Sequence, residues 1–308
     1  MSLLDKRILM VTGKGGVGKT TVSVAIALAA AARGKRVIIA ETSGAEVVPP
    51  LFDSLRGGYE PHPVSAGVST LSITPEAALE DYVVQQIRFR SLFKLVFRNR
   101  IVKPFTDAVP GLHDAVQLGK VFDLERASRP GGQPLWDLIV VDAPATGHGL
   151  TMLGSAQTMM DLTRAGPMFE GVRQVQEVMA DPVRSALVLV SLPESMPTSE
   201  TLDLYRRLDD QQRAQVGAVV LNSLYPRPLP QEDWDAARPL LADAPPAVAE
   251  AAAMVDRWQG RVQQQADARA KLAGIPCPLL ELRHRFDGSP DAAALLEMGE
   301  ALLAQEEA

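Results

Sequence analysis

Cysteine is almost absent from this chain of 308 residues, which contains a single one, Cys277. One thiol excludes a disulfide within the chain and a zinc site built from several cysteines. It equally excludes an iron–sulfur cluster held by the chain's own cysteines. Such sparing use of cysteine fits a reducing compartment, so we expect a cytoplasmic protein without zinc.

Long apolar runs and an excess of basic residues are also absent. No run of about 18 uncharged apolar residues occurs, and the chain reaches Arg7 without a signal-peptide pattern. The net charge of −6 argues against a general affinity for nucleic acid or anionic lipid. Residues 286–308 hold six acidic residues and no Lys or Arg. We therefore expect no nucleic-acid partner and no stable membrane anchor.

The chain does have a glycine-rich loop between an expected strand and an expected helix. Residues 13–21 read GKGGVGKTT and fit the pattern G-x-x-x-x-G-K-[ST]. The apolar run 7–12 predicts a buried parallel strand, and 22–29 predicts a helix, which is the context that this pattern needs. The nucleotide-binding residues that we expect here are Gly13, Lys14, Gly15, Gly16, Val17, Gly18, Lys19, Thr20 and Thr21.

Each residue type in this loop suits phosphate binding. The glycines allow backbone N–H groups to turn toward the β-phosphate, and the following helix presents its positive end to the same anion. Lys19 would reach the β- and γ-phosphates, and the Thr20 hydroxyl would hold Mg²⁺. The apolar run 138–142 ends in Asp142, which is typical of a carboxylate beside that magnesium. The alternatives are a glycine-rich turn with an accidental lysine and an aspartate that only caps a strand.

Apolar runs alternate with helical patterns along the whole chain. With 46% hydrophobic and 22% charged residues, the composition indicates an ordered globular protein. The alternation predicts an α/β fold with a doubly wound, mostly parallel sheet in one domain spanning 1–308. Two helical insertions are expected, at about 74–130 and 150–180. The expected strands are 7–12, 36–41, 69–73, 138–142, 186–192, 216–222 and 278–282.

Three segments together resemble the ArsA branch of the deviant, signature-lysine P-loop ATPases. They are GKGGVGKTT with its extra lysine at position 14, DAPATGH at 142–148, and VVLN at 219–222. That branch includes the arsenite-pump ATPase and the eukaryotic targeting ATPase for tail-anchored proteins. The resemblance implies a SIMIBI-like P-loop NTPase fold, ATP and Mg²⁺ as cofactors, and a dimer formed around the nucleotide. The dimer would be a homodimer or a heterodimer with a paralogous ATPase.

The resemblance also implies roles for individual residues. Lys14 would cross the dimer interface to the partner's nucleotide, and Asp142 would bind magnesium through water. Residues 146–148 would form a nucleotide-sensing switch. Asn222 would contact adenine, and Pro278 lies in the stretch after Ile275, beginning at Pro276, that resembles the segment closing over the base. The alternative for Asn222 is a turn residue at a strand end.

One departure from the family puts hydrolysis in question. Ser43 stands where an aspartate that positions the attacking water is expected. A serine hydroxyl cannot accept the proton of water at neutral pH. Glu41 lies on the same strand face and is the first candidate for a surrogate, with Glu46 second. Two hypotheses follow: a switch ATPase that couples hydrolysis to cargo release, and a hydrolysis-impaired regulatory subunit paired with an active paralogue.

The insertions suggest a hydrophobic client. Residues 81–105 mix apolar and basic side chains around the whole helix, and five of the ten methionines fall within 150–180. In the targeting ATPases such helices form a groove for a transmembrane segment. The alternative is that both stretches pack on each other and on the sheet, which is the commoner outcome for apolar helices. The cysteine count speaks against the family's thiol-based arsenite and zinc sites.

Overall fold

The structure is a computed structural model that describes residues 2–54, 57–87, 109, 111–145, 152, 154–155, 158–161, 166–208, 210–241 and 243–307. The expected switch at 146–148 and most of the apolar and basic stretch 81–105 lie outside the described residues. No helix of the described ranges combines the length and the apolar composition that a membrane crossing would need.

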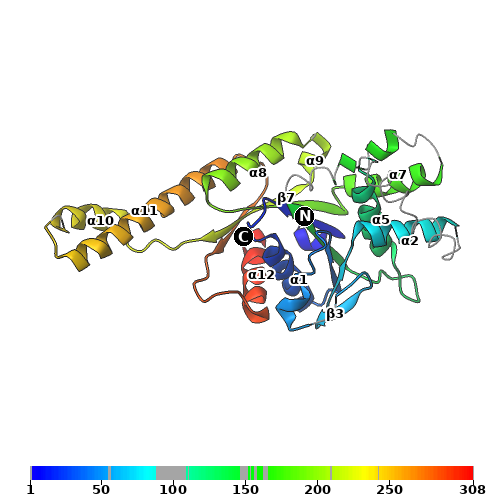
Figure 1. Cartoon of the computed structure of the whole chain (residues 1–308), viewed down its shortest axis with the longest axis horizontal. Helices are drawn as coiled ribbons and strands as arrows, with labels where there is room; N and C mark the ends of the chain where they lie inside the picture. The colour runs from blue at the N-terminus through cyan, green and yellow to red at the C-terminus, as the bar shows by residue number, and fades with distance from the viewer. Residues whose placement is uncertain are drawn as a thin grey trace, which may run out of the picture.

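One eight-stranded sheet runs through the molecule in the order β3-β4-β2-β5-β1-β6-β7-β8 (Figure 1). All neighbouring pairs are parallel except β3 and β4, so the predicted α/β fold with a mostly parallel sheet is confirmed. The seven expected strands all form, and β3 is an antiparallel edge strand that the sequence pattern did not reveal. The strands are β1 Ile8–Gly13, β2 Val37–Glu41, β3 His62–Ser65, β4 Val68–Ser72, β5 Leu138–Ala145, β6 Ser185–Ser191, β7 Val216–Leu224 and β8 Leu279–Arg283.

Helices cover both faces of the sheet because the central strands are apolar on both sides. One face packs against α1 and α12, where a Cβ at Gly299 would overlap the carbonyl oxygen of Ala25. The other face packs against α5, with α2, α7, α8 and the end of α11 around it. The α-helices are α1 Lys19–Ala32, α2 Pro75–Ile87, α5 Leu112–Arg126, α7 Pro167–Ala180, α8 Ser195–Arg207, α9 Asp210–Ala214, α10 Gln231–Ala237, α11 Pro246–Leu272 and α12 Ala292–Glu307. Short 3₁₀ turns occupy Leu3–Asp5, Pro49–Phe52 and Arg238–Leu241.

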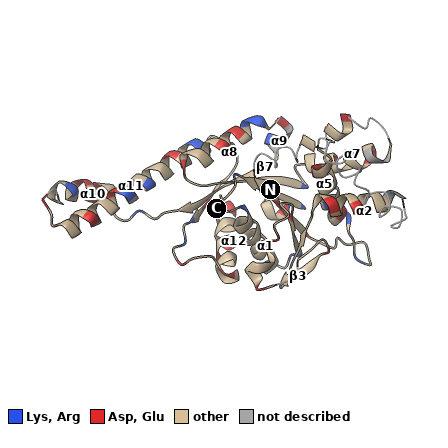
Figure 2. Ribbon diagram, viewed as in Figure 1, with Lys and Arg blue, Asp and Glu red and all other residues tan. Residues whose placement is uncertain are grey.

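The pair α10 and α11 forms an arm that extends away from the sheet (Figure 1). Of the 27 residues of α11, the buried ones all lie between Gln259 and Leu272. The first half of the helix contacts α10, where Trp234 Nε1 donates to Asp256 Oδ1 over 2.9 Å, and the Arg238–Leu241 turn. Trp258 Nε1 also donates to the Pro226 carbonyl oxygen over 2.7 Å. Acidic and basic residues both occur along this arm (Figure 2).

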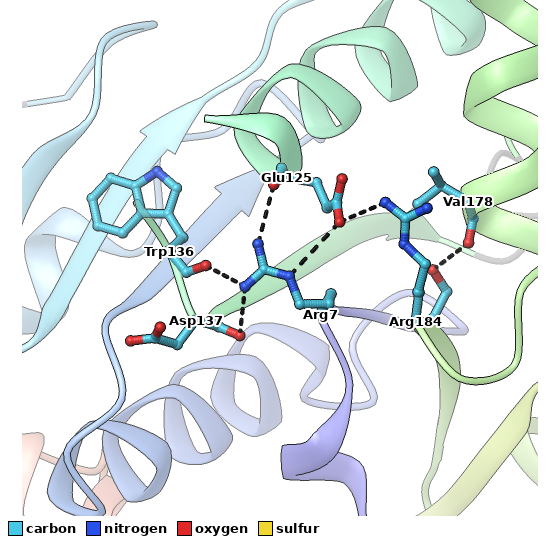
Figure 3. A network of polar contacts seen from close by, with 7 residues as sticks. Arg7, Glu125, Trp136, Asp137, Val178 and Arg184 are labelled. Carbon is cyan, nitrogen blue, oxygen red and sulfur yellow. Dashed lines mark hydrogen bonds and ion pairs between the residues drawn. The ribbon is translucent and has the colours of Figure 1, made fainter. Parts of the chain in front are cut away.

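A buried carboxylate links α5 to the amino-terminal edge of the sheet (Figure 3). Glu125, near the end of α5, is 8% exposed. Its Oε1 accepts a hydrogen bond of 2.6 Å from Arg184 Nη2 and lies 3.7 Å from Arg7 Nε. Arg7 Nη2 also donates to the Glu125 carbonyl oxygen. Because Arg7 and Arg184 directly precede β1 and β6, the two ion pairs join α5 to the central strands.

Candidate nucleotide-binding site

The carboxyl ends of five strands meet at one edge of the sheet. Gly13 of β1 is level with Ala145 of β5 and Val190 of β6. The pairings Glu41 with Asp142 and Ser191 with Leu221 bring β2 and β7 to the same edge. In open parallel sheets this edge is where ligands bind, and the glycine-rich loop leaves β1 here.

The loop has the shape that a phosphate cradle requires. Gly16 and Gly18 have φ angles of 83° and 92°, which are accessible mainly to glycine. A Cβ at Gly13 would overlap the Val190 carbonyl oxygen, and one at Gly18 would overlap the Asn222 amide. Helix α1 then begins at Lys19 without a side-chain cap. The N–H groups of its first turn are thus available to an anion.

Lys19 places its ammonium inside this loop. Its Nζ donates to the carbonyl oxygen of Lys14 over 3.0 Å. Burial lowers the pKa of Lys19, and the negative charge of Asp142 partly opposes that effect. A phosphate oxygen would be a stronger partner for the ammonium than the carbonyl, because the phosphate carries a full negative charge and the carbonyl does not.

Asp142 and Thr20 lie together beside Lys19. The Thr20 hydroxyl donates to Asp142 Oδ2 over 2.6 Å, and the Ser23 hydroxyl donates to Oδ1 over 3.2 Å. Burial raises the pKa of Asp142, whose side chain is 3% exposed in β5, while both hydroxyl contacts lower it. A carboxylate and a hydroxyl are the hard oxygen ligands that Mg²⁺ prefers, so the residues present fit that ion.

Asn222 also lies at the loop. Its Nδ2 donates to the Val17 carbonyl oxygen over 2.9 Å, which connects the end of β7 to the phosphate loop. The predicted contact with adenine stays a prediction. Pro278, however, is not brought to this group. It precedes β8, and its carbonyl oxygen accepts from the N–H of Val219, in the middle of β7.

The chain reaches the site edge at the other end of β8. Arg283 ends the strand, and His284 follows it. His284 Nδ1 lies 2.6 Å from Ser223 Oγ, and its ring stacks on Tyr225 with centroids 4.4 Å apart. Sequence reasoning did not single out these residues, because it associated the stretch at the start of this strand with the base. In a parallel sheet it is the carboxyl end of the strand that lies at the ligand-binding edge.

Glu41 is the last residue of β2, and Ser43 lies in the loop that follows the strand. Ser43 is exposed, whereas Glu41 is 1% exposed and accepts hydrogen bonds of 2.6 and 2.9 Å from the N–H groups of Val47 and Val48. Burial raises the pKa of Glu41, and these two contacts lower it. The geometry favours a role in holding this loop, and action as a surrogate base stays a prediction. Glu46 is exposed in the same loop and has a φ angle of 43°.

Lys14 is paired within its own chain. Its Nζ lies 2.7 Å from Glu200 Oε1 on α8. Sequence reasoning did not predict this contact. A separation of 186 positions leaves no local signal for it.

The insertion helices enclose a cavity of about 290 Å³ between α2, α5 and α7. Aromatic and charged side chains both line it, among them Tyr59, Tyr82, Phe122, Asp81 and Lys120. Met152 and Met159 are buried, and Met160 and Met179 pack against the same core. This burial favours the packing alternative for these four methionines.

The fold and this site define a class: an α/β nucleotide-binding protein with a phosphate loop, its lysine, and an acid at the end of the adjacent strand. The chain belongs to the ArsA family of anion-transporting ATPases, whose sequence model matches residues 6–166 and 158–238. It is 30% identical to the ATPase BagA of Mycobacterium tuberculosis over 97% of this chain and 93% of that protein. It is 27% identical to an arsenical pump-driving ATPase of Escherichia coli over 89% of this chain and 46% of the pump ATPase. The ATPase GET3 of Kluyveromyces lactis is 25% identical over 71% of this chain and 72% of its own length.

Proposed function

We propose that this chain is a cytoplasmic switch ATPase that binds Mg–ATP at residues 13–21 and dimerises around it. The state of the nucleotide would control binding of a hydrophobic or membrane-protein client. The observation that carries the proposal is the grouping of Lys19, Thr20 and Asp142 beside a loop that also bears Lys14. Family membership supports ATP as the nucleotide.

Each residue of the site would have its own role in binding Mg–ATP. Loop N–H groups and the Lys19 ammonium would bind the β- and γ-phosphates. Thr20 directly and Asp142 through water would hold Mg²⁺, which neutralises charge developing on the phosphate oxygens. Lys14 would reach the partner's nucleotide. The cavity between α2, α5 and α7 supports a client site on the insertion helices, as does the resemblance to a targeting ATPase.

A second candidate is a hydrolysis-impaired regulatory subunit that pairs with an active paralogue. Two observations favour it. Ser43 replaces the expected aspartate, and the nearest surrogate, Glu41, already accepts two backbone hydrogen bonds. Binding of ATP without efficient turnover is the expected behaviour of such a subunit.

Single-turnover hydrolysis of Mg–ATP by the purified chain separates the two candidates. Turnover that Glu41→Gln abolishes supports a switch ATPase with a surrogate base. Absent turnover that Ser43→Asp restores supports the regulatory subunit. Lys19→Ala supplies the variant without a phosphate-binding ammonium, and Lys35→Ala, beyond the other end of α1, supplies its control. If ATP affinity is the same in wild type and Lys19→Ala, the assignment of the site fails.

Coupling to a client needs its own measurement. A labelled apolar peptide of about 20 residues, the length of a membrane-spanning helix, serves as the probe. The switch hypothesis expects its affinity to differ between the states with ADP and with a non-hydrolysable ATP analogue. Equal affinity in both states would remove the client from the proposal while leaving nucleotide binding in place.

A further inference from the structure

The ion pair between Lys14 and Glu200 joins the phosphate loop to α8. Lys14 Nζ and Glu200 Oε1 are 2.7 Å apart, and the two side chains are 26% and 35% exposed. The lysine that is expected to leave its own chain thus has a carboxylate partner on that chain. The pair lies beside the nucleotide site. None of the phosphate or magnesium contacts proposed for that site involves Glu200.

The position of Glu200 is fixed by the packing of α8. The helix follows β6, whose Val190 is level with Gly13 at the base of the loop. Thr198 and Thr201 are both 1% exposed, and the Thr201 hydroxyl donates to the Pro197 carbonyl oxygen over 2.9 Å. Further along the same helix, Asp203 pairs with Arg206 on the exposed side. Helix α8 therefore presents one carboxylate to the loop and another to solvent.

We propose that Glu200 is a positioning residue that holds Lys14 on its own chain in the free protomer and competes with phosphate for its ammonium. This inference rests on the homodimeric form of the proposed function. Lys14 cannot extend to a partner's nucleotide while its Nζ remains at 2.7 Å from Glu200. Dimer formation must therefore break the pair in each protomer. The free energy of the ion pair thus opposes nucleotide-dependent dimerisation.

The free energy that the pair contributes depends on how exposed its two side chains are. A partly exposed ion pair contributes about 0.2–1 kcal/mol, which corresponds to roughly a 1.5- to 5-fold change in an equilibrium constant. A symmetric dimer breaks two such pairs, so removing the carboxylate charge should tighten dimerisation roughly 2- to 25-fold. Glu200→Gln removes the charge but retains the shape, and Glu200→Asp retains the charge on a shorter side chain.

Sedimentation of the full chain with Mg²⁺ and a non-hydrolysable ATP analogue tests the inference. We expect Glu200→Gln to lower the dimer dissociation constant by that factor. Glu200→Asp should lie between Glu200→Gln and wild type. Asp203→Asn, on the exposed side of the same helix, should match wild type. In a Lys14→Ala background, Glu200→Gln should change nothing, because the partner of the carboxylate is gone.

The outcomes distinguish the inference from the function on which it rests. A wild-type chain that stays monomeric with nucleotide overturns the homodimer and the inference together. A nucleotide-dependent dimer whose affinity Glu200→Gln leaves unchanged or weakens overturns only the inference. The same holds if Glu200→Gln acts equally in the Lys14→Ala background. Thermal unfolding of each variant identifies a loss of folding, and Glu200→Asp then supplies the decisive comparison.

Discussion

The Thr20 hydroxyl donates to Oδ2 of Asp142 over 2.6 Å and thereby joins the first turn of α1 to the end of β5. Two residues 122 positions apart in the sequence form one oxygen-rich group beside the Lys19 ammonium. The sequence predicted that both residues lie beside one magnesium ion, but not that they hydrogen-bond directly to each other.

Asp142→Asn should make the affinity of the chain for ATP depend less on Mg²⁺. Replacing an outer partner of a metal site lowers metal affinity by about 10- to 100-fold, so the affinity for Mg–ATP should fall while that for ATP in EDTA changes little. Titration calorimetry with and without Mg²⁺ measures both. Asp137→Asn is the control, because Asp137 precedes the same strand at the opposite edge and pairs with Arg36. Equal losses with and without Mg²⁺ would contradict a role in holding the metal.

Glu41→Gln should change how stability depends on pH. Burial raises the pKa of Glu41 above its ordinary value of 4.5, so between that value and the raised pKa the folded state binds more protons than the unfolded chain. The contribution of Glu41 to stability is present below this window and is lost as pH rises through it. The amide keeps the acceptor for Val47 and Val48 without the charge. The variant should therefore gain stability relative to wild type as pH rises.

Urea unfolding from about pH 4.5 to about pH 7.5 measures this difference. The pKa of Asp142 is also raised, so Asp142 contributes to the pH dependence of stability in both wild type and Glu41→Gln. Only the difference in stability between these two proteins reports on Glu41. Glu46→Gln, which alters an exposed carboxylate in the same loop, is the matched control. A difference between Glu41→Gln and wild type that does not vary with pH would contradict the assignment.

Gly299→Ala should destabilise the fold despite the better helix propensity of alanine. A Cβ at Gly299 would overlap the Ala25 carbonyl oxygen where α12 crosses α1. Backbone cannot move aside as a side-chain tip can, so we expect a loss of about 1–3 kcal/mol. Gly260→Ala in α11 is the control, because no atom lies within 4 Å of the added carbon. That variant should gain roughly 0.5–1 kcal/mol, and opposite signs in chemical denaturation are the expected result.

Glu125→Gln should loosen α5 from the sheet. The carboxylate is 8% exposed and faces Arg7 and Arg184, so its loss leaves two arginines without their acidic partner. Both arginines are partly exposed, which limits the expected cost to about 1–3 kcal/mol. Glu177→Gln removes an exposed carboxylate paired with Arg173, and because solvent screens that pair the variant should be nearly as stable as wild type. Hydrogen exchange should rise in α5 for the first variant and not for the second.

Much of the fold followed from local pattern. Seven apolar runs became strands, and β1, β2 and β6 are buried at every residue, as strands covered on both faces of a parallel sheet should be. At the start of α2, the Thr74 hydroxyl accepts a hydrogen bond from the Ala77 N–H, which is the contact of a helix-capping residue. The edge strand β3 did not follow, since its four residues, HPVS, are only partly buried and include a proline.

Some features of the candidate site could likewise be predicted from the sequence, and others could not. Lys19 and Thr20 could be assigned from the sequence because the loop's glycines, lysine and threonine are adjacent in the chain. Pro278 was associated with the nucleotide from a resemblance that did not specify which end of β8 approaches the site. The partners of Glu41 and Lys14 had no sequence signal, because hydrogen bonds to backbone groups and to a distant helix leave no spacing pattern.

The sequence by itself determined that this protein is an α/β nucleotide-binding ATPase relative, since the loop's conformation and chemistry reside in nine consecutive residues, 13–21. Only the tertiary structure decided that Thr20 meets Asp142, that Asn222 supports the loop, and that Lys14 is paired with Glu200. The physical reason is distance along the chain. Sheet order and helix packing bring these residues together, and neither is encoded in the spacing of any one segment.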